Sequence, residues 1–429
     1  MENTEFVPGV RAALVSVITR GESEESANAS LAELRRLLET AGGEAVFTLI
    51  QNKEAPDVRT YLGSGKAAEL CYYCATNEVE LAVFDCELSP SQIRNLEAVL
   101  GNVRVIDRSM LILDIFALHA VSGEGKLQVE LAQLKYTAPR LIGKGAALSR
   151  LGGGIGTRGP GESQLETDRR HLQRRIHALE NALEEMAAGR KTQRAARDRS
   201  GLARLAIVGY TNAGKSTLLN YLTDAGILAK DQLFATLDPT TRKCTLPGGE
   251  TVLLTDTVGF IRNLPHHLVH AFRSTLDEAV YADLLVIVID ASDPEAAAQL
   301  QVTEELLESL GAGGKPTIYV FNKCDLGVAT PGLVPKDAVS VYISARSGQG
   351  VDVFLTRVEE MLHAGKRRVT FLFPNAKQGL LNRLYENATV ETVEYGAEGV
   401  TVTATVDDKT YGPLRQYDTA PKKEERDEW

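Results

Sequence analysis

Cysteine is scarce in this 429-residue chain, and its five cysteines follow no disulfide framework. Scattered single thiols are typical of proteins that work in a reducing compartment. Cys71 and Cys74 form a C-x-x-C pair, but no second pair follows at the spacing of a zinc finger. Both fall in an expected helix, so we interpret them as helix residues, with metal or redox use as the minor alternative.

Long apolar runs are also missing. The longest, such as residues 284–289, have the length of a buried strand, far short of the roughly 20 residues that a membrane-spanning helix needs. The first nine residues carry acidic side chains and no long apolar core, so we expect no secretory signal. With 44% hydrophobic and 24% charged residues, the composition is that of an ordinary soluble protein, and we expect it to be cytoplasmic.

A net positive charge is lacking as well. The net charge of −10 argues against indiscriminate binding of nucleic acid. Residues 140–204 reverse this balance locally, with 14 Lys and Arg against 7 Asp and Glu. A basic arm on an acidic protein predicts one surface that meets a polyanion.

The basic arm combines apolar heptads with a glycine-rich stretch. Residues 143–161 hold eight glycines and cannot bury a core of their own, while Lys144, Arg150 and Arg158 lie among them. Free backbone N–H groups beside arginines suit RNA phosphates and unpaired bases, although a plain linker is the alternative. We therefore predict an antiparallel helical hairpin with a basic tip. Its seam would be Leu127, Leu131, Leu134, Ala138 and Leu141 on one helix, and Leu165, Leu172, Ile176, Leu179, Leu183 and Met186 on the other.

The remaining sequence predicts a multidomain α/β protein. Apolar runs alternate with amphipathic stretches over residues 10–120, which favours a parallel sheet covered by helices. The last 64 residues show two strand-like segments around one helix and end in a charged run that we expect to be disordered. We predict an N-terminal α/β domain (1–122), the hairpin (123–200), a P-loop domain (201–365) and a small C-terminal α/β domain (366–429).

One stretch organises the chain. An apolar run, residues 205–208, is followed by Gly209-Tyr210-Thr211-Asn212-Ala213-Gly214-Lys215-Ser216 and then by an amphipathic segment. This strand–loop–helix context with G-x-x-x-x-G-K-[ST] spacing predicts a phosphate-binding loop. Its glycines turn backbone N–H groups toward phosphate oxygens, and the following helix adds its positive end. Lys215 would reach the β- and γ-phosphates, and the Ser216 hydroxyl would bind Mg²⁺.

Two similar stretches lack this pattern. Gly63-Ser64-Gly65-Lys66 and Gly123-Glu124-Gly125-Lys126 have no glycine five residues before the second Gly and no Ser or Thr after the Lys. Neither is a second phosphate loop by pattern. Residues 63–66 remain a minor candidate for an anion-binding turn at a helix start, with a plain turn favoured.

Two downstream segments complete a guanine-nucleotide site. Asp256-Thr257-Val258-Gly259 follows a strand, so that Asp256 can hold Mg²⁺ through water and the Gly259 N–H can meet the γ-phosphate. In Asn322-Lys323-Cys324-Asp325, the Asp325 carboxylate can accept from N1–H and the 2-amino group of guanine, which adenine lacks. Ser344-Ala345-Arg346 can close over the base, while Asn322 and Lys323 brace the loops. We predict GTP and GDP as ligands.

The segment Phe234-Ala235-Thr236-Leu237-Asp238 lies between the phosphate loop and Asp256. A threonine here would complete Mg²⁺ coordination when the γ-phosphate is present and release it after hydrolysis. Thr236 is our choice, with Thr240 and Thr241 as alternatives. Residues 228–243 then form a first switch, and residues 259–270 a second. Lys215, Thr236 and Gly259 are the predicted catalytic residues.

A catalytic glutamine is absent. Ras-type enzymes place a glutamine after the glycine of the second switch to orient the attacking water, and this chain has Phe260. Phenylalanine cannot orient water, so we expect slow intrinsic hydrolysis that a partner accelerates.

Over nearly its whole length the chain resembles the HflX family of translational GTPases, within the TrmE–Era–EngA–YihA–Septin-like group, and several segments are most specific for it. The segments are Leu113-Asp114-Ile115-Phe116-Ala117, residues 124–134 and residues 153–170, besides the phosphate loop and residues 234–238. The resemblance implies that Thr236 binds Mg²⁺ beside Ser216.

The resemblance further implies a partner and a function. It implies binding to the large ribosomal subunit and its rRNA, splitting of stalled or idle ribosomes under stress, and ribosome-stimulated hydrolysis by a factor that we expect to be monomeric off the ribosome. The N-terminal domain of some members is credited with ATP binding and RNA remodelling, which the glycine–lysine stretches here do not support by pattern. The alternatives are a GTP-gated RNA-remodelling or RNA-modifying enzyme and a GTP-dependent scaffold.

Overall fold

The computed structural model divides into two compact units, each described by itself. The first comprises Met1–Thr245 and Thr251–Val351, and the second Leu246–Glu250 and Asp352–Trp429. Among the residues that the structure describes, no helix has the length and apolar character needed to cross a bilayer. The described residues are 9–141, 160–198, 202–223, 233–234, 236–264, 273–364, 366–377, 379–396 and 398–419.

The first unit begins with a four-stranded sheet of order β2-β1-β3-β4 in which all neighbours are parallel. This confirms the parallel sheet that the alternating sequence predicts. Ser23 and Ser89 cap the N-termini of α1 and α3, and Pro90 begins α3. The elements are β1 (Arg11–Ile18), α1 (Glu24–Thr40), β2 (Glu44–Asn52), α2 (Ser64–Thr76), β3 (Leu81–Phe84), α3 (Pro90–Leu100), β4 (Arg104–Asp107) and α4 (Arg108–His119).

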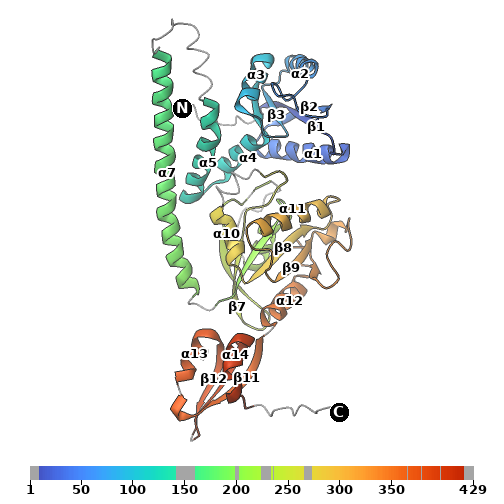
Figure 1. Ribbon diagram of the computed structural model, residues 1–429. Coiled ribbons are helices and arrows are strands. Elements are labelled where there is room, and N and C mark those ends of the chain that lie inside the picture. Colours follow the sequence, from blue (N-terminus) through green and yellow to red (C-terminus); the bar gives the residue numbers. More distant parts are fainter. Residues whose placement is uncertain are drawn as a thin grey trace, which may run out of the picture. The chain divides into compact units, whose positions relative to one another are not determined.

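Apolar residues on the two faces of this sheet form separate cores. Leu34 and Leu37 of α1 and Leu111 of α4 belong to one cluster, whereas Leu70 of α2 and Leu96 of α3 belong to the other. The helices therefore cover the sheet in two layers, as expected for parallel strands buried on both sides (Figure 1).

Residues 63–66 form an ordinary helix start. Gly63 precedes α2 with a φ of −64°, and its N–H donates to Gln51 Oε1 at 2.9 Å. The Lys66 ammonium is paired with Glu69 at 3.0 Å. The stretch is therefore the first turn of a helix, and anion binding there stays a prediction.

The helical hairpin is present, with α5 (Gly123–Leu141) lying beside α7 (Pro160–Asp198) in Figure 1. Arg175 of α7 donates to both oxygens of Glu130 at 2.7 and 2.8 Å, and Lys135 pairs with Glu180 at 2.7 Å. The predicted glycine-rich basic tip, including Lys144, Arg150 and Arg158, lies outside the described residues.

The predicted seam is partly wrong. On α7, Leu172 and Leu179 are buried as expected, but Met186 is 40% exposed. On α5, the most buried apolar residues are Val129 and Ala132, whereas the predicted Leu127, Leu131 and Leu134 are half-buried. The reason is that α5 packs against α4 as well as α7, so two faces of this helix are covered.

The second sheet of the first unit has six strands in the order β10-β9-β8-β5-β7-β6. All neighbours are parallel except β6 and β7. Strand β6 begins within the predicted first switch. The sequence did not indicate a strand there, because this edge strand is polar and half-exposed and so has no apolar run. The elements are β5 (Arg204–Gly209), α8 (Lys215–Thr223), β6 (Thr240–Thr245), β7 (Thr251–Asp256), α10 (Arg273–Tyr281), β8 (Leu284–Asp290), α11 (Ala296–Ser309), β9 (Thr317–Asn322) and β10 (Val339–Tyr342).

The second unit contains a three-stranded antiparallel sheet of order β11-β13-β12. Phe371, Phe373, Leu384 and Val402 belong to its separate core. The sequence missed β12, an edge strand in which Glu391 and Glu394 interrupt the apolar pattern, and placed α12 with the P-loop domain. The elements are α12 (Val351–His363), β11 (Lys366–Phe373), α13 (Gly379–Asn387), β12 (Thr389–Tyr395), β13 (Val400–Asp407) and α14 (Asp408–Leu414); residues 420–429, where we expected disorder, are not described.

A carboxylate is buried between α4 and α5. Asp114 is 3% exposed, and its Oδ1 accepts from Gln133 Nε2 at 3.2 Å. Its Oδ2 is buried without a hydrogen-bond partner among the described residues. Burial raises the pKa of Asp114 to about 6, although the charge of Arg104 and the Gln133 bond both oppose this rise.

We expect Asp114→Asn to stabilise the first unit at neutral pH. An aspartate whose pKa is higher folded than unfolded binds protons more tightly in the folded state, so wild-type stability falls as pH rises from about 4 to about 6. The variant lacks this loss and should gain up to ~3 kcal/mol at pH 7, and almost nothing at pH 4. Urea unfolding between pH 4 and pH 8 measures the difference.

The exposed Asp337 supplies the control, because Asp337→Asn changes the same chemical group without burial. A stability difference between wild type and Asp114→Asn that is constant across this pH range would contradict the assignment.

Candidate functional site

The loop between β5 and α8 has the backbone that a phosphate requires. Asn212 and Gly214 have φ angles of +60° and +97°. A Cβ on Gly214 would lie 2.1 Å from the Asn322 side-chain nitrogen, so only glycine fits this close approach. The loop leads directly into the N-terminus of α8, whose free N–H groups and dipole favour an anion.

Lys215 is buried beneath this loop. Its ammonium donates to the carbonyl oxygens of Gly209 at 3.1 Å and Tyr210 at 2.8 Å, and the residue is 6% exposed. Burial lowers the pKa of Lys215 to about 8, while the nearby Asp256 charge opposes this shift. A phosphate anion arriving here would supply the counter-charge that the buried ammonium lacks.

Three oxygen-bearing side chains converge beside Lys215. The Ser216 Oγ lies 2.7 Å from Thr236 Oγ1 and donates to Asp256 Oδ2 at 2.7 Å. Asp256 is fully buried, and its Oδ1 has no hydrogen-bond partner within the described ranges. Burial raises the pKa of Asp256, and Lys215 and both hydroxyls act against this effect. Hard oxygen donors with one unpartnered carboxylate oxygen fit a small divalent cation such as Mg²⁺.

The geometry distinguishes among the three candidate threonines. Thr236 is the one whose hydroxyl lies beside Ser216. Thr240 is the first residue of β6, and the Thr241 hydroxyl lies 2.9 Å from that of Thr255 in the neighbouring strand. This arrangement supports the choice of Thr236 over its alternatives.

The segment after β7 lies against the phosphate loop. A Cβ on Gly259 would lie 2.7 Å from Thr211 Cα and 3.0 Å from Lys215 Nζ, which leaves no room for a side chain. The Thr257 hydroxyl donates to Ile207 O at 2.8 Å, and Val258 is 5% exposed. These contacts place the Gly259 backbone near the Lys215 ammonium, where the sequence predicts the γ-phosphate.

Phe260 is turned away from solvent. Its side chain is 1% exposed, and its backbone pairs with the phosphate loop through Thr211 N–H to Phe260 O at 2.7 Å. The ring is therefore part of the core and presents no polar group to a water molecule.

The predicted base-binding segments meet at the ends of β9 and β10. Asn322 is 2% exposed; its Nδ2 donates to Ala213 O at 2.8 Å and its Oδ1 accepts from Ala345 N–H at 2.9 Å. It thus joins the phosphate loop to residues 344–346, as expected for a bracing residue. The Lys323 ammonium pairs with Asp290 at 2.7 Å. Ser344 is buried, Cys324 is half-buried, and Asp325 and Arg346 are exposed.

Phe234 joins the first switch to the phosphate loop. This residue has a φ of +57°, is 2% exposed, and its N–H donates to Thr211 Oγ1 at 2.9 Å. Leu237 is also buried. Ala235 lies outside the described residues. The Asp238 carboxylate faces the start of α5, and its predicted contact with nucleotide stays a prediction.

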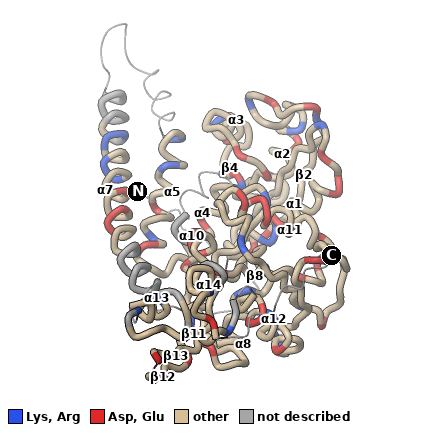
Figure 2. Tube along the Cα trace, turned by 60° about the horizontal axis from the view of Figure 1, so that its bottom comes forward, with Lys and Arg blue, Asp and Glu red and all other residues tan. Residues whose placement is uncertain are grey.

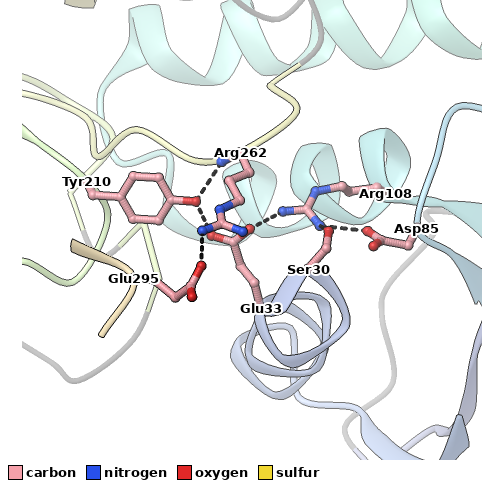
Figure 3. A network of polar contacts seen from close by, with 7 residues as sticks. All are labelled: Ser30, Glu33, Asp85, Arg108, Tyr210, Arg262 and Glu295. Atoms are coloured by element: carbon pink, nitrogen blue, oxygen red, sulfur yellow. Dashed lines mark hydrogen bonds and ion pairs between the residues drawn. The ribbon is translucent and has the colours of Figure 1, made fainter. Parts of the chain in front are cut away.

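Sequence reasoning missed a polar network around Tyr210 (Figure 3). The Tyr210 hydroxyl accepts from the Arg262 backbone N–H at 2.7 Å and donates to Glu33 of α1. Glu33 and Asp85 both pair with Arg108, which is 2% exposed. A phosphate-loop residue is thereby joined to the second switch and to the first sheet, and no local sequence pattern signals such contacts.

Helix α1 also lines a cavity at the site. This cavity of about 620 Å³ is bordered by Arg36 and Thr40 of α1, by Asn212 of the phosphate loop, and by Asp290 and Lys323 near the predicted base loop. The phosphate loop is thus open to solvent on a side partly formed by the first sheet's helices.

Comparisons with known families agree with this site. Residues 204–323 match the family described as "50S ribosome-binding GTPase". Residues 28–117 match "GTP-binding GTPase N-terminal", and residues 119–197 match "GTP-binding GTPase Middle Region". The matches therefore include most of the first sheet, nearly all of the hairpin and most of the phosphate-loop sheet.

Curated relatives extend over nearly the whole chain. "GTPase HflX" of Caldanaerobacter subterraneus is 49% identical over 407 residues, which cover 95% of this chain and 93% of the relative. "GTPase HflX" of Escherichia coli is 43% identical and covers 84% of this chain and 85% of the relative. Among solved structures, a GTP-binding protein from Sulfolobus solfataricus in complex with GDP is 27% identical, covers 82% of this chain and 98% of that chain, and has a TM-score of 0.42.

We expect Asp325→Ala to erase the distinction between GTP and ITP, which lacks the 2-amino group. Wild type should bind GTP more tightly because the carboxylate accepts two hydrogen bonds from guanine and one from hypoxanthine. Two lost bonds to a charged acceptor correspond to roughly 100-fold weaker GTP binding, and ITP should lose less. Calorimetric titration with both nucleotides measures this.

Asp337→Ala removes another exposed aspartate from the same unit and should leave both affinities unchanged. Equal losses for GTP and ITP in Asp325→Ala would show that the carboxylate does not read the 2-amino group.

Proposed function

We propose, because this chain belongs to the HflX family of GTPases, that it is a translation factor that binds the large ribosomal subunit and hydrolyses GTP there. A family match over residues 204–323, described as a ribosome-binding GTPase, supports the partner. The finer proposal is that GTP-dependent binding splits or rescues stalled and idle ribosomes under stress.

The site supports the nucleotide chemistry. In our proposal, the phosphate-loop N–H groups and Lys215 hold the β- and γ-phosphates, and Asp325 reads the guanine edge. Ser216 and Thr236 would ligate Mg²⁺ directly, with Asp256 behind them. Mg²⁺ bound there would neutralise charge that develops on the transferred phosphoryl group. The orphaned oxygen of Asp256, together with the two hydroxyls at 2.7 Å, supports this arrangement.

The apolar side chain of Phe260 is the main observation that supports a dependence of GTP hydrolysis on the ribosome. The residue that would orient the attacking water in a Ras-type enzyme is here an apolar ring, 1% exposed. The proposed phosphate and metal ligands lie close together, but position 260 supplies no group for the water. A partner that adds such a group, or moves one into the site, then accelerates hydrolysis.

The hairpin supports contact with rRNA. Arg169, Arg170 and Arg174 are exposed on α7, along which Figure 2 shows both blue and red segments. The glycine-rich tip, which is known only from its sequence, adds further basic residues. Exposed cations on a projecting hairpin are suited to a phosphate backbone, and binding of this kind weakens with salt.

We expect purified large ribosomal subunits to raise GTP turnover at least tenfold over the protein alone. The stimulation should fall steeply as salt rises, because cationic contacts release counterions. Phosphate release measured at several salt concentrations, with large or small subunits, checks this. Lys215→Ala should abolish turnover in both conditions and excludes contaminating activity.

Equal turnover with and without large subunits at every salt concentration would contradict the proposal. Strand separation or chemical change in naked RNA would instead support a GTP-gated RNA-remodelling or RNA-modifying enzyme.

A further inference from the structure

The side chain of Asp238, a residue of the first switch, contacts the two residues that precede the hairpin helix α5. One carboxylate oxygen accepts from the backbone N–H groups of Val121 at 3.0 Å and Ser122 at 2.7 Å. The other accepts from the Ser122 hydroxyl. The bonded residues are separated by 117 positions for Val121 and by 116 positions for Ser122. The contacts are therefore tertiary and not part of a local turn.

The carboxylate completes the N-terminal cap of α5. Ser122 Oγ accepts from the Gly125 N–H at 2.8 Å, and Asp238 satisfies the N–H groups of the two residues that precede the helix. A Cβ on Gly125 would lie 2.4 Å from Asp238 Oδ1. A side chain at position 125 would therefore displace the Asp238 carboxylate from this contact.

A second anchor lies on the other side of Thr236. The Phe234 ring meets Phe116 of α4 edge-on, with centroids 4.7 Å apart, and both residues are 2% exposed. Thr236 lies between this aromatic contact and the Asp238 cap, and its hydroxyl is 2.7 Å from Ser216 Oγ. The position of the threonine is thus fixed by groups outside the P-loop sheet.

We propose that Asp238 is a positioning residue for GTP hydrolysis: by capping α5 it holds Thr236 in the metal-binding position and ties the first switch to the ribosome-binding hairpin. The inference rests on the proposed function. This role differs from direct nucleotide binding, because the polar contacts of Asp238 within the described ranges are with Val121 and Ser122, the two residues that precede α5.

Linkage makes this contact reciprocal. If γ-phosphate and Mg²⁺ draw Thr236 into place, they also favour the capped start of α5, and the cap favours GTP over GDP by the same factor. GDP has no γ-phosphate to draw Thr236 into place, so the affinity for GDP should not depend on the cap. The cap is therefore a nucleotide-dependent link between the P-loop and the hairpin.

The test compares a non-hydrolysable GTP analogue with GDP in full-length protein. We expect Asp238→Ala to weaken binding of the analogue about tenfold, the usual range for a charged cap, and GDP less than twofold. Thr236→Ala should show the same selective loss. The double variant should bind the analogue no more weakly than Thr236→Ala alone, because the two substitutions remove the same interaction.

Two further variants separate positioning from other roles. Ser122→Ala removes the hydroxyl partner and should lower analogue binding in the same selective way, by a smaller factor. Ser23→Ala removes a cap of the same kind from another helix, the bond from the Ser26 N–H to Ser23 Oγ at the start of α1, and should change neither affinity. An unchanged Ser122→Ala, an equal loss for both nucleotides in Asp238→Ala, or additive effects in the double variant would each overturn the proposal.

Amide hydrogen exchange tests the same link at the residues that precede α5. The amides of Val121 and Ser122 should exchange at least severalfold more slowly with the GTP analogue than with GDP, and Asp238→Ala should remove this difference. Equal exchange in both nucleotide states of wild type would overturn the inference. If wild type did not bind the analogue at all, the proposed function itself would fail, and the two failures are therefore distinguishable.

Discussion

The buried carboxylate of Asp256 is the constraint on which the site depends. A fully buried anion needs compensation, and Ser216 supplies one hydrogen bond while the Lys215 ammonium opposes the rise in its pKa. One oxygen still has no partner among the residues described. In our proposal, these charges become fully compensated when a phosphate and a cation bind together, so that the bound nucleotide would complete the electrostatic balance of the site.

The first sheet and the P-loop sheet share one apolar core. Leu34 of α1 and Leu111 of α4 belong to the same cluster as Phe234 of the first switch and Ile287 of β8. Together with the polar network of Figure 3, this core explains why the N-terminal region, hairpin and P-loop sheet form one compact unit. Changes in the switches therefore act on a continuous core and not on a loosely attached neighbour.

The sequence predicted the phosphate loop and the parallel sheet of the N-terminal domain, because glycine spacing and apolar runs are local signals. It did not predict that Tyr210 contacts Glu33 or that Asp238 faces α5, since these contacts join distant segments. Strand β6 was missed because an exposed edge has little apolar pattern. The α5 seam was wrong because heptad spacing describes one packed face and this helix has two.

Gly125 shows how a rejected pattern can still have a structural reason. Its Gly-Glu-Gly-Lys context resembles a phosphate loop but lacks the required spacing, and the structure places it against Asp238. A side chain there would displace the carboxylate that caps α5. The glycine thus lets an anion approach closely, as in a phosphate loop, but the anion is a side chain of the first switch. Because the same carboxylate follows Thr236 by two residues, the base of the hairpin and the metal position constrain each other.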